Sequence, residues 1–358
     1  MRLSFVMPNL LTSDGQRLVT GGLERFAWQL LDAARDAGYE VDVHQNASED
    51  WCRTVKKIEI RGHGLARIST IAALESIHQS TDRCVYLSIL QEPQAFRPGS
   101  LVVSHGVWWD RPGVSAQDHL DLCRKALQLA AEVVSVDYNF LNVMRATFPD
   151  LAGKVTVIPN GVDMAQFYPP RSGRSGPPTV LFPRRLDPAR GLDLFLAAME
   201  GLLADHDVRI TLAVDANDEA RTAALRRRVG EGLFAGRVTL RTASFDEMPA
   251  LYRGADIVAI PSLYSEGTSM SLLEALASGC AVVASDVGGI TNVVLNGFNG
   301  LLVRPSVPAL RSALQELLEN PARRRELGQQ ARRSAAAFDL AQWRLAWVDA
   351  LHRVYGGP

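Results

Sequence analysis

Strand-like and helix-like segments alternate along this chain of 358 residues, and the alternation begins twice. In the first half, short apolar runs predict buried strands at residues 3–7, 40–44, 85–89, 101–104, 133–136 and 155–158. Amphipathic stretches separate several of these runs: one begins at Leu23, and others are predicted near residues 65–79, 117–131 and 137–147. This order predicts a parallel sheet that is covered by helices on both faces.

A stretch of linker composition, PPRSGRSGPP at residues 169–178, separates the two halves. Strands are then predicted at residues 179–182, 209–214, 238–241, 257–261, 281–284 and 300–303. Helices are predicted near residues 192–204, 217–229, 246–253, 269–278 and 307–319. We therefore expect an α/β protein with two Rossmann-like βαβ domains that face an interdomain cleft, where ligands commonly bind.

Composition excludes several classes of protein. The formal net charge is −1, which argues against a general nucleic-acid binder. The four cysteines form no C-x-x-C pair, which argues against a disulfide framework or a zinc site. The apolar start of the chain is broken by Ser4 and Pro8, unlike a signal peptide, and no apolar run is long enough to span a membrane. We expect a cytoplasmic protein, with peripheral contact at the inner membrane surface left open.

The most informative motif lies in residues 261–304, where Glu266 and Glu274 stand eight positions apart. Glu266 lies in a Ser/Gly loop, and Glu274 lies in the helix that this loop opens. A carboxylate can accept hydrogen bonds from two adjacent hydroxyl groups, as a ribose presents them. Three residues at the helix start, Gly267, Thr268 and Ser269, carry backbone N–H groups that suit a phosphate.

Three further elements follow strand ends. Arg185 and Arg190 come after the first strand of the second half, and Gly21-Gly22 comes after the first strand of the chain. Basic side chains and close-approaching glycine backbone both suit a phosphate group. His105 follows the strand at residues 101–104, where it is either a catalytic or a structural residue.

The frame E-G-x-S-x-x-L-L-E-A at residues 266–275 closely resembles the donor site of the family 4 glycosyltransferases, which are retaining enzymes of the GT-B fold. The resemblance implies that Glu274 binds the ribose and that Glu266 contacts the donor sugar near the reacting carbon. It also implies that Arg185 and Arg190 grip the donor diphosphate, although the family usually has Lys at the second position. By the same resemblance, Gly21-Gly22 faces the phosphates and His105 lies near the reacting carbon.

The resemblance also sets the expected domain boundaries. An acceptor-binding domain is expected over residues 1–167, a linker over 168–178 and a donor domain over 179–339. The segment 340–358 resembles the last GT-B helix, which crosses back to the first domain. Packing on its own domain is the alternative for this segment.

The expected activity is sugar transfer from a nucleotide-diphospho-sugar, UDP-sugar before GDP-sugar, without a metal or another cofactor. The acceptor is expected to be a carbohydrate, lipid-linked or small-molecule hydroxyl, by default in cell-surface polysaccharide or lipopolysaccharide synthesis. Two alternatives stay open: an epimerase of the same fold, which needs no acceptor, and a catalytically silent partner that only binds nucleotide-sugar.

Overall fold

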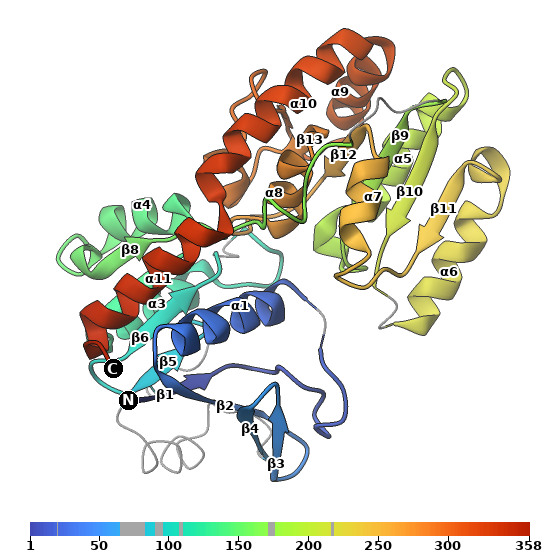
Figure 1. Ribbon diagram of the computed structural model, residues 1–358. Helices are drawn as coiled ribbons and strands as arrows, with labels where there is room; N and C mark the ends of the chain where they lie inside the picture. Colours follow the sequence, from blue (N-terminus) through green and yellow to red (C-terminus); the bar gives the residue numbers. More distant parts are fainter. Residues whose placement is uncertain (20, 65–82, 90–95, 107–109, 171–175, 216–217) are drawn as a thin grey trace. The chain divides into compact units, whose positions relative to one another are not determined.

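The computed structural model describes residues 1–19, 21–64, 83–89, 96–106, 110–170, 176–215 and 218–358. These residues form two compact units (Figure 1). The first unit contains Met1–Asn160 and Ala341–Pro358, and the second contains Gly161–Leu340. The helix predicted near residues 65–79 lies outside the described residues, and so do Trp108 and Trp109, two aromatic residues that follow His105 in the sequence.

The first unit is built on an eight-stranded sheet with the order β3-β4-β2-β1-β5-β6-β7-β8. The strands are β1 Arg2–Val6, β2 Glu40–Asn46, β3 Trp51–Val55, β4 Ile58–His63, β5 Cys84–Tyr86, β6 Leu101–Ser104, β7 Glu132–Ser135 and β8 Val155–Val157. All neighbours run parallel except β3, which is antiparallel to β4. Every strand predicted for this half is present. Strand β5 ends at Tyr86, whereas its predicted range extends to residue 89.

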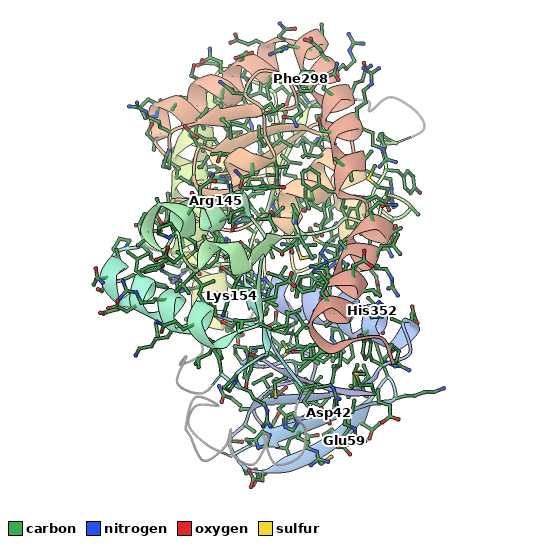
Figure 2. The ribbon with its side chains drawn as sticks, turned by 90° about the vertical axis from the view of Figure 1, so that its left-hand side faces the viewer. Asp42, Glu59, Arg145, Lys154, Phe298 and His352 are labelled. Carbon is green, nitrogen blue, oxygen red and sulfur yellow. The ribbon has the colours of Figure 1, made fainter. Side chains whose placement is uncertain are left out.

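The hairpin of β3 and β4 is absent from the sequence prediction. Its turn is made by Lys56 and Lys57, which both have positive φ angles (51° and 64°). Glycine or asparagine usually occupies such positions, so the sequence carries no turn signal there. Strand β4 pairs with β2 in parallel, with Asp42 opposite Glu59 (both labelled in Figure 2).

Helices α1 Gly22–Asp36, α3 Ala116–Leu129, α4 Tyr138–Thr147 and α11 Leu340–Tyr355 pack in the first unit, where α11 is drawn in red (Figure 1). Phe26 of α1 makes edge-on contacts with Trp343 and Trp347 of α11, at centroid distances of 5.4 and 5.3 Å. At the end of α11, the Tyr355 hydroxyl accepts the Leu101 N–H at 2.8 Å. The aromatic stripe of the last helix is thus buried within the first unit.

The second unit has a six-stranded parallel sheet with the order β11-β10-β9-β12-β13-β14. The strands are β9 Thr179–Pro183, β10 Arg209–Ala213, β11 Val238–Arg241, β12 Ile257–Ile260, β13 Ala281–Ser285 and β14 Leu301–Val303. Numbered within the unit, this order is 3-2-1-4-5-6, the order of the Rossmann fold. The chain reverses its direction of winding between β9 and β12.

Both faces of this second sheet are covered, as its continuously apolar strands predict. Along β9, Val180 and Phe182 join one apolar cluster, while Leu181 joins the other. The helices of the unit are α5 Leu192–Leu203, α6 Glu219–Val229, α7 Met248–Gly254, α8 Met270–Ala277, α9 Val307–Glu319 and α10 Pro321–Ala335. In the described part of the chain, no helix is long and apolar enough to cross a membrane.

Candidate functional site

The candidate site lies in the second unit, where the strand order reverses. Ligands of open α/β sheets bind outside the carboxyl ends of the two strands at this point. One loop follows β9 and carries Arg184, Arg185 and Arg190; the other follows β12 and carries Ser262 and Glu266. The sheet order therefore brings together side chains that are about 80 residues apart in sequence.

Glu266 is the centre of a buried polar network. Nη2 of Arg184 lies 2.7 Å from both carboxylate oxygens, and the Ser262 hydroxyl donates to Oε1 at 2.6 Å. Nη1 of Arg190 donates to Oε2. Nη1 of Arg184 donates to the Ser269 hydroxyl at 2.7 Å, which ties the network to the start of α8.

The contacts with Arg184, Arg190 and Ser262 keep the Glu266 carboxylate ionised. Burial alone would raise the pKa of Glu266, but the guanidinium groups of Arg184 and Arg190 and the Ser262 hydroxyl outweigh it and lower the pKa to about 2. Burial in turn lowers the pKa of Arg184, although Glu266 opposes that shift. The network therefore contains an ionised glutamate at neutral pH.

Two glycines allow the loops to approach one another. Gly191 has φ 75°, and a Cβ there would lie 1.9 Å from the Pro261 carbonyl oxygen. Gly288 has φ 48°, and a Cβ there would lie 2.6 Å from the carbonyl oxygen of Glu266. The next N–H, that of Gly289, donates to this same carbonyl at 2.7 Å. These contacts fix the backbone that presents Arg190 and Glu266.

The chain enters α8 through Gly267, Thr268 and Ser269, which are all buried and directly precede the helix. Ser269 is the N-cap residue, yet its hydroxyl accepts from Arg184 and makes no side-chain cap to the helix. An N-terminal turn without this cap has N–H groups suited to an anion. The three residues lie beside the Glu266 network because Ser269 belongs to it.

Glu274 lies in α8 and is 4% exposed. It is adjacent to Tyr252, whose pKa is raised well above its usual value by burial and by the Glu274 carboxylate. The Tyr252 hydroxyl also contacts the Ser271 carbonyl at 3.2 Å, and the Ser271 hydroxyl donates to the Pro183 carbonyl at 3.0 Å. Glu274 is therefore held on a helix that is tied to the end of β9.

The two predicted arginines differ in their surroundings. Arg190 bonds to Glu266, and its side chain is 18% exposed. Arg185 is exposed, and its side chain has no hydrogen bond or ion pair with any described residue. Arg184 is 7% exposed and bonds directly to Glu266, but it was not among the predicted site residues. Its position after a buried strand was the available signal, but two adjacent arginines gave no indication of which one points inward.

Gly21, Gly22 and His105 belong to the first unit. Gly21 is the N-cap residue of α1 in extended conformation, and Gly22 begins that helix. Burial lowers the pKa of His105 to about 4, despite a hydrogen bond with the backbone of Leu87. His105 is therefore neutral at pH 7, and its ring stands edge-on to Phe26 at 4.6 Å.

A further titratable group follows β7 in the same unit. Asp137 is 1% exposed and is the N-cap residue of α4, where Oδ1 accepts the Phe140 N–H at 2.8 Å. Burial raises its pKa to about 6, although the N–H groups of Phe140 and Asn139 act in the opposite direction. Compared with the unfolded chain, the folded first unit therefore stabilises the neutral form of Asp137 relative to its ionised form.

This shift predicts a pH-dependent effect of Asp137→Asn on stability. Because folding raises the pKa, the stabilisation from the neutral acid is complete below the usual pKa and is lost as the pH rises through about 6. Asparagine resembles the neutral acid and still caps the helix. We expect the variant to be more stable than wild type by on the order of 3 kcal/mol at pH values above about 6, and equally stable at about pH 3, below the usual pKa of the acid.

Thermal unfolding of wild type and Asp137→Asn, once below the usual pKa of the acid and once above about pH 6, measures this difference in stability. Asp218→Asn makes the same exchange at the N-cap of α6, where the aspartate side chain is 47% exposed, and serves as the control. An Asp137→Asn offset that is the same at both pH values would contradict the assigned pKa.

Comparison with known proteins adds to this geometry. Residues 177–320 match the model of the family "Glycosyl transferases group 1". The chain aligns over its whole length with sucrose-phosphate synthase from Thermosynechococcus elongatus, with a TM-score of 0.81, 21% identity and full coverage of both chains. Anabaena HepE, solved in complex with UDP-glucose, aligns with a TM-score of 0.77 and 19% identity, over 99% of this chain and 100% of that one.

The fold is GT-B. This confirms the fold class predicted from the sequence: a GT-B α/β protein with two Rossmann-like units. In sequence, the chain is 29% identical to the MMP alpha-(1->4)-mannosyltransferase of Mycolicibacterium hassiacum, over 67% of this chain and 58% of that protein. The chain spans about half the length of the curated relatives that it matches.

Proposed function

We propose that this GT-B protein is a retaining glycosyltransferase of the hexosyltransferase type, which moves a sugar from a nucleotide-diphospho-sugar to an acceptor hydroxyl. The observation that carries the proposal is the loop after β9. It carries the exposed cation of Arg185 next in sequence to Arg184, which bonds to the buried, ionised Glu266, at the reversal point of a Rossmann sheet. Such an arrangement suits a ligand that has both a diphosphate and a neutral sugar.

The diphosphate would be bound by Arg185, Arg190 and the backbone N–H groups at the start of α8. Two guanidinium groups and a helix N-terminus can neutralise the charge that develops on a leaving diphosphate. This chemistry would allow transfer without a metal. In the first unit, the backbone at Gly21 and Gly22 would contribute from the start of α1.

Glu274 would hold the ribose through its two carboxylate oxygens. We favour a UDP-sugar as the donor, with GDP-sugars second, because HepE, a protein of the same fold, was solved in complex with UDP-glucose. Residues 177–320, which match a glycosyltransferase family, include all the residues of the second unit that are assigned to the donor: Arg185, Arg190, Glu266–Ser269 and Glu274.

Glu266 is better suited to hold the sugar than to attack it. Its oxygens accept from Arg184, Arg190 and Ser262, and its low pKa marks a weak nucleophile. Retention would then proceed by attack of the acceptor on the same face from which the diphosphate leaves. A neutral His105 would orient the sugar or accept the proton of the acceptor hydroxyl.

For the acceptor, we propose a carbohydrate or lipid-linked hydroxyl in cell-surface polysaccharide or lipopolysaccharide synthesis, with a small molecule second. The resemblance to the family as a whole is the support for this assignment, because residues 266–275 resemble the donor site and carry no information about the acceptor. We also propose a cytoplasmic location, because the four free cysteines fit a reducing compartment, and we leave peripheral contact at the inner membrane surface open.

A turnover assay tests the proposed activity. UDP-glucose and GDP-mannose are each incubated with the protein, with and without a panel of glycan acceptors, and products are followed by NMR. We expect release of a nucleoside diphosphate that depends on an acceptor, with the anomeric configuration of the donor retained. Conversion of the donor without acceptor would indicate an epimerase, and binding without turnover would indicate a silent partner.

A further inference from the structure

The carboxylate of Glu266 has no room for a sugar hydroxyl in the structure as it stands. A carboxylate offers about four lone-pair positions. Four contacts within hydrogen-bond distance already occupy these positions: Arg184 and Ser262 reach Oε1, and Arg184 and Arg190 reach Oε2. The two Nη2 protons of Arg184 are shared among both carboxylate oxygens and the Ser262 hydroxyl. One of these donors must leave before Glu266 can accept a bond from a ligand.

The donors differ in how firmly they are held. Arg184 has a side chain that is 6% exposed, and it also bonds to Ser269 and Ser262. Arg190 is 18% exposed, and among the described residues Glu266 is the only hydrogen-bond partner of its side chain. Arg190 is therefore the donor that can leave at the lowest cost.

Arg190 can leave without leaving the buried carboxylate unpaired only because Arg184 stays bonded to Glu266. An ionised carboxylate left in a buried site without a cation is strongly destabilised. With Arg184 and Ser262 in place, Glu266 keeps three of these four contacts, and each of its oxygens still has a donor. The released guanidinium then needs a new anion, and the proposed diphosphate supplies one.

We propose that Arg190 exchanges Glu266 for the donor diphosphate, and that Arg184 is the positioning residue that makes this exchange possible. The exchange opens one acceptor position on Oε2 for a hydroxyl of the donor sugar. The sugar contact thus becomes available only when the diphosphate is bound. This inference rests on the proposed function, because it needs a diphosphate ligand.

A double-mutant cycle measured by calorimetric binding of UDP tests the exchange. Arg184→Gln makes Arg190 the only cation beside the buried carboxylate, so Arg190 is retained there. We expect Arg184→Gln to weaken UDP binding by on the order of tenfold or more. Glu266→Gln releases Arg190, so UDP should bind that variant at least as tightly as wild type.

The double variant gives the decisive comparison. If Arg184 acts through Glu266 and Arg190, Arg184→Gln/Glu266→Gln should recover UDP affinity to within a few-fold of Glu266→Gln. A purely structural role for Arg184 predicts that the double variant stays as weak as Arg184→Gln, and this result would overturn the proposal. Arg184→Lys keeps the charge but loses the planar fork, so an affinity between those of wild type and Arg184→Gln is expected.

Two outcomes distinguish a failure of the proposed function from a failure of the Arg190 exchange. Failure of the wild-type protein to bind any nucleoside diphosphate would overturn the proposed function itself. Binding by wild type with no recovery in the double variant would overturn only the exchange. Should Arg184→Gln fail to fold in thermal unfolding, Glu266→Gln alone still decides, because a tenfold loss of UDP affinity in that variant would exclude competition for Arg190.

Discussion

Arg185→Ala should weaken nucleoside diphosphate binding by about tenfold to a hundredfold, which corresponds to the loss of one or two charge-assisted hydrogen bonds. The unfolding temperature should not change, because the Arg185 side chain is exposed and bonds to no described residue. Calorimetric titration with UDP, together with thermal unfolding, measures both quantities.

Two matched variants sharpen this prediction. Arg226→Ala removes another exposed arginine of the second unit, on α6, and should leave UDP affinity unchanged. Arg185→Lys keeps the charge without the planar fork, so it should bind UDP with intermediate affinity. Equal affinity in Arg185→Ala and wild type would remove Arg185 from the site.

Glu266→Gln should lower turnover by about a hundredfold to a thousandfold, the usual cost of removing one preorganised electrostatic group from an active site. UDP affinity should be kept, because glutamine removes the negative charge that competes for Arg190. Steady-state kinetics with a nucleotide-sugar and an active acceptor, beside calorimetry with UDP, separates the two effects.

The other glutamate provides the contrast for this second prediction. Glu274→Gln should act mainly through donor affinity, since Glu274 is assigned to the ribose and Glu266 to the sugar. Weaker donor binding in Glu266→Gln and normal donor binding in Glu274→Gln would reverse the two assignments. Near-normal turnover in both variants would contradict the site as a whole.

The sequence was sufficient to predict the fold because strand and helix periodicity, with a Pro/Gly/Ser-rich break, is a local property of the chain. The exception, the hairpin of β3 and β4, has a physical reason. Its turn places Lys56 and Lys57 in the left-handed region, where the residue type gives no warning. Residues 51–55 also alternate weakly, because most of their side chains are exposed.

The site was only partly predictable for a different reason. Adjacent residues near a strand end point in opposite directions, so Arg184 and Arg185 have opposite environments. Which of them turns inward depends on Glu266, which is 82 residues away in the chain. Gly288 illustrates the same limit: its close approach to the Glu266 backbone follows from tertiary packing and not from a local motif.

Calorimetric binding of UDP, GDP, ADP and dTDP to the purified protein, with EDTA present, tests the central claim most directly. The account predicts that one diphosphate, UDP first, binds without a metal and that Arg185→Ala reduces this binding. Absence of binding by all four nucleotides would contradict the donor site and, with it, the proposed transferase activity.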